Sequence, residues 1–298
     1  MFNRKLSPST FFKASTTTLA ACVLMACGGE SSDSNDTQTF KLTEPAMMAH
    51  EGKSVYQLNV QDNNGNPLSS VTPMMMPMMD MASGDQHAAP HTGCTETDSA
   101  GNADCTVYFL MPSMMNDNKM GDWNLSFSLP ESEEEAVSFP TTVMMAMNGP
   151  VKVKMISAND KIASMTMAMD DSMPAGDSRP YYVFNNGLSE DNSSIELFVA
   201  AKESMMNFPT LIEGLVLNED SDFELTISSI EIQVSTDNVT WETATSAGKG
   251  LWTANGLSNY SNTVYVKLFV NDVVKTNNSN DFASFVSTEN TMKAMGDM

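Results

Sequence analysis

The chain has 298 residues and a formal net charge of −22, from 15 Lys and Arg against 37 Asp and Glu. An excess of negative charge repels phosphate backbones, so we expect no nucleic-acid partner. The acidity fits a surface kept soluble by charge, and it favours cations nearby.

The first residues have the layout of a secretory signal. Basic residues at positions 4, 5 and 13 accompany a mostly apolar run over residues 14–26, and this order is typical of an export signal. The run is too short to span a membrane as a mature helix. We therefore expect residues 1–26 to be a signal peptide and the rest of the chain to work outside the cytoplasm.

The signal ends in Leu24-Met25-Ala26-Cys27, which resembles the lipobox of bacterial lipoproteins. The resemblance implies that Cys27 is acylated and becomes the first residue of a membrane-anchored chain. Gly28 in place of Asp implies sorting to the outer membrane, facing the periplasm. Residues 27–38 are polar, so we expect a lipid anchor followed by a flexible tether. An ordinary cleaved signal with an incidental cysteine is the alternative.

Strand patterns dominate the remaining chain of about 270 residues, which is enough for two domains. Segments with alternating or β-branched and aromatic residues are bounded by Asn, Asp, Gly or Ser, and no long stretch has a helical period. These segments are residues 54–61, 106–110, 123–129, 151–156, 194–200, 223–234 and 263–270. The pattern predicts an all-β fold of two sandwiches in tandem behind the lipidated tether.

A seam between the two sandwiches is expected near residues 130–178, where acidic and polar segments interrupt the strand pattern. We place the first domain at residues 39–130 and the second at residues 176–280. Residues 131–175 form connecting strands and a linker in this division, and the strands near 137–169 could begin the second sandwich. Residues 281–298 are a tail, with a frayed or short helical end at 287–298.

Two of the four cysteines belong to the folded part of the chain. Cys22 lies in the signal and Cys27 takes the lipid, which leaves Cys94 and Cys105. Exported cysteine pairs form disulfides, and the turn residues Gly101-Asn102 between them predict a hairpin closed by one bridge. A thiol metal site is the alternative.

Methionine is unusually frequent, with 27 residues in the chain and 18 of them between Met74 and Met173. The densest run is residues 74–81, with His87 and His91 just beyond it. Pro73, Pro77 and Pro90 each remove a backbone donor, so we expect a loop here. Further groups follow at residues 111–120, 144–147 and 165–173.

Thioethers select monovalent copper, and imidazole suits divalent copper. A thioether also needs no deprotonation, so methionine is a practical ligand in a compartment where thiols oxidise. The candidate ligands are Met74, Met75, Met76, Met78, Met79, Met81, His87, His91, Met111, Met114, Met115 and Met120.

Packing or sacrificial oxidation is the alternative role for these methionines. We expect Met155, Met205 and Met206 to serve packing, because Met155 alternates with Val151 and Val153. His50 alone is expected to be an exposed bystander.

The first domain resembles the YtkA-like and FixH-type periplasmic Ig-like domains over about 90 residues. The resemblance rests on a turn at residues 62–68, the Met-rich and His-containing segment, the run Val107–Met114, and Met120-Gly-Asp-Trp-Asn-Leu125. It implies an Ig-like sandwich, copper handling or support of cytochrome oxidase assembly, candidate ligands at residues 111–120, and a core position for Trp123. The Cys94 and Cys105 pair and the second domain depart from the family's pattern.

Enzyme motifs are missing from the sequence. There is no Gly-x-Ser-x-Gly elbow, phosphate-cradling glycine loop or His-Glu-x-x-His helix, and only three histidines could act as bases. Asp98, Asn102 and Asp104 are spaced loosely like a calcium loop but lack its terminal Glu, so we interpret them as hairpin residues. We expect no catalytic activity.

The leading hypothesis from the sequence is a lipid-anchored periplasmic copper carrier or buffer that serves a copper acceptor protein. A structural or adhesive surface lipoprotein with Ig-like domains and no metal role is the alternative. An accessory for a metal-dependent oxidase is a third hypothesis.

Overall fold

The computed structural model describes residues 38–43, 48–130, 135–146, 151–163, 176–189, 191–257 and 263–286. The predictions for the signal peptide, for Cys27, for the tether up to residue 37 and for the end of the tail at 287–298 lie outside these ranges. Every regular element in the described part of the chain is a strand, and none there is a helix that could cross a membrane. The predicted all-β fold is therefore confirmed.

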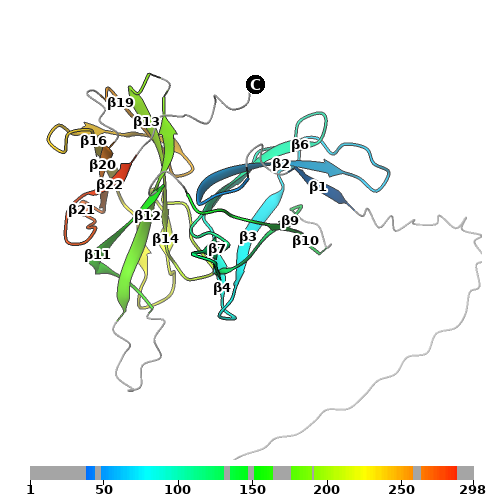
Figure 1. The fold of residues 1–298 in the computed structure, drawn as a ribbon, viewed down its shortest axis with the longest axis horizontal. Helices are drawn as coiled ribbons and strands as arrows, with labels where there is room; N and C mark the ends of the chain where they lie inside the picture. Colours follow the sequence, from blue (N-terminus) through cyan, green and yellow to red (C-terminus); the bar gives the residue numbers. More distant parts are fainter. Residues whose placement is uncertain are drawn as a thin grey trace, which may run out of the picture. The chain divides into compact units, whose positions relative to one another are not determined.

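The first half of the described chain forms two four-stranded antiparallel sheets (Figure 1). In spatial order, one sheet contains β1 (Thr39–Thr43), β2 (Gly52–Gln61), β6 (Asn102–Phe109) and β5 (His91–Cys94). The other contains β10 (Val137–Thr141), β9 (Gly121–Ser128), β3 (Met74–Met81) and β4 (Gln86–Ala88). A short hairpin, β7 (Met114–Met115) with β8 (Asn118–Lys119), precedes β9.

Alternating burial along β2 and β9 makes these two sheets into a sandwich. Successive side chains of a strand point to opposite faces, so one set of alternate residues can enter a shared core. Tyr56 and Leu58 of β2 meet Trp123, Leu125 and Phe127 of β9 in one apolar cluster, and all five are fully buried. The predicted core position of Trp123 is thus confirmed.

The second half forms two further antiparallel sheets and a small hairpin. The first of these sheets contains β11 (Lys152–Ile162), β12 (Asp177–Leu188), β13 (Ser194–Ala201), β19 (Leu251–Asn255) and β18 (Thr245–Gly248). The second contains β17 (Glu242–Thr243), β16 (Ile230–Ser235), β20 (Thr263–Val270) and β21 (Val273–Val274), and β22 (Ala283–Val286) also pairs with β20. The hairpin joins β14 (Val216–Leu217) to β15 (Leu225–Thr226).

A second apolar core lies between these sheets. Met155, Tyr181 and Val183 from one sheet pack with Ile232 and Val266 from the other, and all five are fully buried. The packing role expected for Met155 is confirmed. The strands between the two predicted domains divide between the cores, because β10 pairs with β9 whereas β11 pairs with β12.

A third apolar cluster joins the two sandwiches. The ring of Tyr108 on β6 stacks on Phe198 of β13, with centroids 3.7 Å apart and planes at 9°, and Phe184 of β12 packs beside both. Asn186 donates to the Tyr108 hydroxyl at 3.0 Å, which supplies a polar partner at the rim. Lys53 and Glu196 form an exposed ion pair across the same contact at 3.2 Å.

The predicted disulfide is present. Cys94 of β5 and Cys105 of β6 are register partners and are bonded, and both are buried. The backbone of the connecting turn bonds to Asp98, whose carboxylate accepts the amides of Ala100 and Asn102 at 2.8 Å each. These bonds hold the pKa of Asp98 below its ordinary value. Asp98 therefore stabilises the turn of the hairpin, which is the role expected from the sequence.

The prediction of a loop over residues 74–81 is wrong, because β3 pairs with β9 along its whole length. The carbonyl of Pro77 accepts a hydrogen bond from the amide of Ala89 at 3.2 Å. In an extended strand the nitrogen of a residue faces the same side as its carbonyl, so the missing donor of Pro77 faces away from β9. Proline therefore removes no bond from the β3–β9 ladder.

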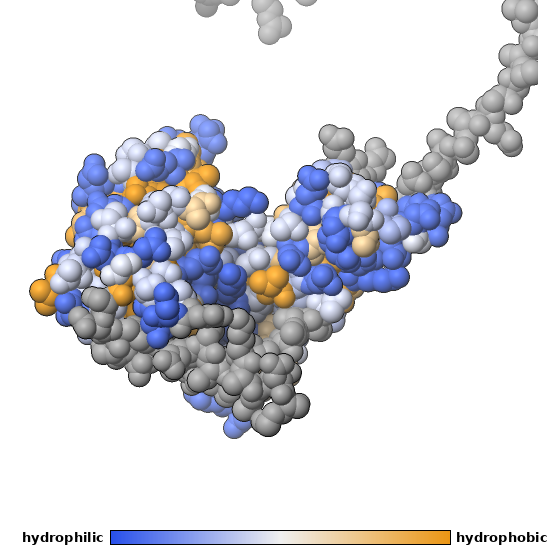
Figure 2. Space-filling model, turned by 90° about the horizontal axis from the view of Figure 1, so that it is seen from above, coloured by the Kyte–Doolittle hydropathy of each residue, from blue (hydrophilic) through white to orange (hydrophobic). Residues whose placement is uncertain are grey.

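Hydrophilic and weakly polar residues cover most of the face shown in Figure 2, with apolar side chains in small separate patches. This distribution is ordinary for a folded domain whose strands alternate between core and solvent.

Candidate functional site

Strand β3 separates its methionines into two rows. Met75 and Met79 face the first core, with 6% and 0% of their surface exposed. Met74 and Met76 point to the other face and are 52% and 62% exposed. Met78 shares that outer face and is partly buried against the cluster between the sandwiches. Alternation along a strand thus gives the same residue type two environments.

The outer row of β3 lies beside a polar row of β9. Met74, Met76 and Met78 are the register partners of Ser128, Ser126 and Asn124, in that order. Hydroxyl and amide side chains are weak competitors for a soft metal ion, so the thioethers are the soft donors on this part of the sheet.

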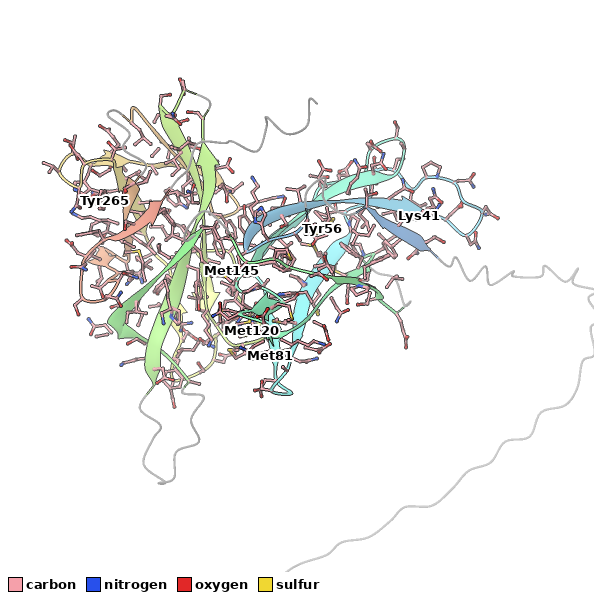
Figure 3. The ribbon with its side chains drawn as sticks, in the orientation of Figure 1. Lys41, Tyr56, Met81, Met120, Met145 and Tyr265 are labelled. Atoms are coloured by element: carbon pink, nitrogen blue, oxygen red, sulfur yellow. A yellow bond between two sulfur atoms is a disulfide. The ribbon has the colours of Figure 1, made fainter. Side chains whose placement is uncertain are left out.

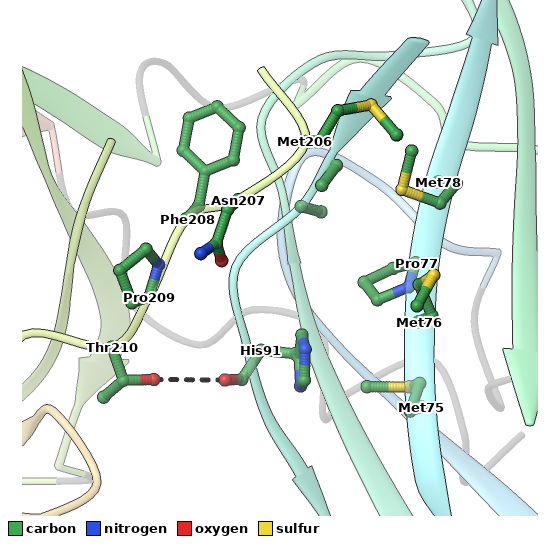
Figure 4. A pocket seen from close by; sticks show the side chains of 12 residues that line it. Met75, Met76, Pro77, Met78, His91, Met206, Asn207, Phe208, Pro209 and Thr210 are labelled. Carbon is green, nitrogen blue, oxygen red and sulfur yellow. Dashed lines mark hydrogen bonds between the residues drawn. The ribbon is translucent and has the colours of Figure 1, made fainter. Parts of the chain in front are cut away.

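A pocket of about 460 Å³ opens next to the outer row (Figure 4). Strand β3 contributes Met75, Met76 and Met78 to its wall, and the segment after β13 contributes Met206 and Phe208. His91 lines the same pocket and also a neighbouring one that contains Met74, Met75 and Met76. Four methionines and one histidine that are far apart in the sequence therefore contribute to the lining of one pocket.

His91 is held at the start of β5 by its backbone. Its carbonyl accepts a hydrogen bond from the Thr210 hydroxyl at 3.2 Å (Figure 4). Its ring atom Nδ1 is buried and has no hydrogen-bond partner. Burial lowers the pKa of His91 below its ordinary value of 6.5, so the ring is neutral at pH 7. A neutral imidazole with a free lone pair can bind a metal ion without first losing a proton.

His87 occupies a packing position rather than the pocket wall. Its ring stacks on Phe208, with centroids 5.0 Å apart, and meets the edge of Trp123 at 6.4 Å. The side chain is 6% exposed, and burial lowers its pKa below 6.5. His87 and His91 are therefore in different surroundings although the sequence places them four residues apart.

The remaining predicted ligands do not line this pocket. Met81, Met111 and Met120 pack against the first core. The amide of Ala82, the residue after Met81, donates to the Met120 carbonyl at 2.9 Å. Met81 and Met120 are labelled in Figure 3. Met114 and Met115 are 48% and 41% exposed on the β7–β8 hairpin. The predicted set of twelve thus divides into pocket, core and hairpin positions.

The packing role expected for Met206 is wrong. The side chain is 50% exposed and lines the pocket beside β3. The amide of Ala88 donates to the Met205 carbonyl at 2.8 Å, which holds the two segments together. The Met205-Met206 pair was the only signal in the sequence for this position. The contact of Met206 with the pocket beside β3 could not be seen, because the two segments are far apart in the chain.

No group of three or more His, Cys, Asp or Glu side chains that could hold a metal ion occurs in the part of the chain that the structure describes. His50, the remaining histidine, is partly buried, and its Nδ1 lies 2.8 Å from the Glu51 carbonyl.

No protein-family model and no curated protein sequence matches the chain. The Yersinia pseudotuberculosis adhesin InvE has a solved structure with 13% identity and a TM-score of 0.26, covering 86% of this chain and 59% of that one. Domains 1–6 of the surface layer protein SbsC give 12% identity and a TM-score of 0.24, covering 86% and 26%. This chain spans less than two thirds of either neighbour, and at such TM-scores neither likeness bears on fold or function.

Proposed function

We propose that this protein binds monovalent copper outside the cytoplasm, as a lipid-anchored carrier or buffer, and that Met76, Met78, Met206 and His91 are its principal ligands. The observation that carries the proposal is the pocket beside β3, which these four side chains line and where the buried Nδ1 of His91 lacks a partner. Three thioethers and a neutral imidazole form a soft donor set that needs no deprotonation.

The division of methionines on β3 narrows the ligand set expected from the sequence. Met75 and Met79 stabilise the first core, and removing them from it would cost apolar burial. Met76 and Met206 contribute little to the stability of the core, because they are 62% and 50% exposed. An ion at the pocket can therefore use the outer residues without opening the sandwich.

The proposal is tested by anaerobic titration of the purified protein with monovalent copper against a chelator of known affinity. The triple variant Met76→Leu/Met78→Leu/Met206→Leu keeps the side-chain volumes but removes the sulfurs. We expect the wild type to bind one ion at this pocket and the variant to lose affinity on the order of 100-fold.

The matched control is Met114→Leu/Met115→Leu, which removes two exposed sulfurs that lie outside the pocket. This variant should keep the wild-type affinity. Equal affinity in the triple variant and the wild type would refute the proposed site.

A structural role without metal is the second candidate function. It is supported by the use of Met75, Met79 and Met155 in the two cores and by the packing of His87 between Phe208 and Trp123. In this case the protein would not compete for copper with even a weak chelator in the titration. The triple Leu variant would also match the wild type in stability.

A further inference from the structure

A buried amine and carboxyl pair lies in the second sandwich and is not part of the pocket beside β3. Lys275 follows β21, and its side chain is 1% exposed. Its Nζ lies 2.6 Å from Oδ2 of Asp160 on β11, and the Asp160 side chain is 11% exposed. Lys152 and Glu51, by comparison, form a pair at 2.8 Å whose side chains are 21% and 16% exposed.

Tyr181 of β12 contacts the same carboxyl oxygen. Its hydroxyl donates to Oδ2 of Asp160 at 2.6 Å, and Lys275 Nζ lies 5.4 Å from the centre of its ring. Burial is the largest cause that raises the pKa of Tyr181, and Asp160 raises it further. The phenol therefore stays protonated and remains a donor to the carboxyl oxygen.

The backbones on both sides of the pair are locked together. Ile156 of β11 and Thr276 exchange two backbone hydrogen bonds, at 2.9 and 2.7 Å. The register of β11 with β12 shifts between Ile156 and Lys161, so Asp160 lies in an irregular part of the strand. Reacting groups held at a fixed short distance gain a large effective concentration over groups that must first meet.

We propose that Lys275 and Asp160 condense into an intramolecular amide, which ties the first strand of the second sandwich to the segment before its last strand. In the reaction, one proton passes from Nζ to Oδ2 across the 2.6 Å contact, which frees the lone pair of the nitrogen. Nζ then attacks Cγ and forms the C–N bond. Nζ gives up a second proton to Oδ2, the bond from Cγ to Oδ2 breaks, and this oxygen leaves as water while Tyr181 hydrogen-bonds to it.

The reaction balances without any added reagent. An ammonium and a carboxylate become one amide and one water, with no change of oxidation state. The pocket methionines take no part, so this inference is independent of the proposed copper function.

Peptide mapping of the full chain tests the proposal directly. Trypsin cleaves after Lys154 and Lys161 to release residues 155–161, which contain Asp160. An amide at Lys275 blocks cleavage there, so its peptide extends over residues 268–293. We expect one linked species whose mass is the sum of both peptides less one water, and this readout does not depend on processing of the N-terminus.

The exposed pair of Lys53 and Glu196 serves as an internal control, because water competes for both groups. Its tryptic peptides should be recovered unlinked. Asp160→Ala and Lys275→Met should each abolish the linked species, and Tyr181→Phe should slow its formation during refolding by about tenfold or more.

Complete recovery of the unlinked peptides from folded wild-type protein would overturn the proposal. Circular dichroism establishes whether each variant folds, but the wild-type digest alone decides the outcome. If Tyr181→Phe forms the linked species as fast as the wild type, the tyrosine has no role in the condensation, although the amide still forms.

Discussion

Arg179 of β12 is a fully buried cation that donates hydrogen bonds to several neighbouring segments. Its guanidinium donates to the carbonyls of Lys202, Lys161 and Phe223 and to the Asn218 side chain, at 2.8 to 3.0 Å. The planar fork of arginine can reach several acceptors in fixed directions at once, which an ammonium cannot. One side chain thus joins strand β11, the residue after β13 and the connection between β14 and β15.

Replacing Arg179 with Met should lower the free energy of unfolding by about 3 kcal/mol, because buried acceptors lose their donors. Urea denaturation followed by tryptophan fluorescence measures the change. Lys41→Met on the exposed face of β1 removes the same charge and should change stability by less than about 0.5 kcal/mol. If both variants lose the same free energy of unfolding, the hydrogen bonds of Arg179 do not contribute to stability.

His87 makes stability depend on pH. Burial lowers its pKa below 6.5 in the folded state, and Lys202 adds a smaller repulsion. As the pH falls below 6.5, the unfolded chain therefore binds more protons than the folded chain, and the free energy of unfolding decreases.

His87→Phe keeps a flat ring against Phe208 and Trp123 but cannot titrate. We expect its free energy of unfolding to fall less than that of the wild type between pH 6.5 and about pH 5. Denaturant titrations at several pH values measure the slope, with His50→Gln as the control. If the free energy of unfolding of His87→Phe falls with pH as steeply as that of the wild type, His87 is not the cause of the pH dependence.

At the scale of elements, the sequence predicts those strands that alternate clearly and are bounded by turn residues. Strands β2, β9, β13 and β20 lie where the pattern puts them, and so does the hairpin with its disulfide. Strand β3 was missed because Pro77 indicates a loop and methionine has little strand preference. Only the pairing partner β9 shows that the proline nitrogen faces away from the ladder.

The pocket could be predicted only in part. The Met-rich run and His91 are visible in the sequence, but their opposite wall at residues 206–210 lies more than a hundred positions away. Local periodicity carries no information about such a contact. It also cannot tell which methionines of a strand face the core until the register is known.

The disulfide contributes at this scale by closing the β5–β6 hairpin. Cys94→Ala/Cys105→Ala should lower the free energy of unfolding by about 3 kcal/mol, since the bridge restrains a short loop of the unfolded chain. Guanidinium denaturation of the variant and of the reduced wild type should give similar midpoints. A variant as stable as the oxidised wild type would refute this expectation.

At the scale of the whole molecule, the two sandwiches share an aromatic contact. Tyr108 is fully buried between elements of both halves, stacked on Phe198 and close to Phe184. Apolar area buried in this way couples the stabilities of the two cores. Lys53 and Glu196 add little to the coupling, because both side chains are more than one third exposed.

Tyr108→Ala should therefore separate the unfolding of the two sandwiches. We expect calorimetry to show one transition for the wild type and two for the variant, with a loss of about 3 kcal/mol in the first sandwich. Tyr265→Ala removes a partly exposed tyrosine of β20 and should leave a single transition. One transition in Tyr108→Ala would show that the halves do not depend on this contact.

The proline of β3 has a consequence for how copies of this protein behave when crowded. Strand β4 pairs only with Met78, Met79 and Asp80, so the earlier half of β3 has a side that β4 leaves uncovered. Such a margin normally invites a strand from a neighbouring molecule to add to the sheet and start aggregation. On that side the carbonyl of Pro77 already accepts the Ala89 amide, and its nitrogen has no proton to donate, so an incoming strand could pair only with the few residues before it. This short margin protects the methionine-rich sheet against merging with its copies.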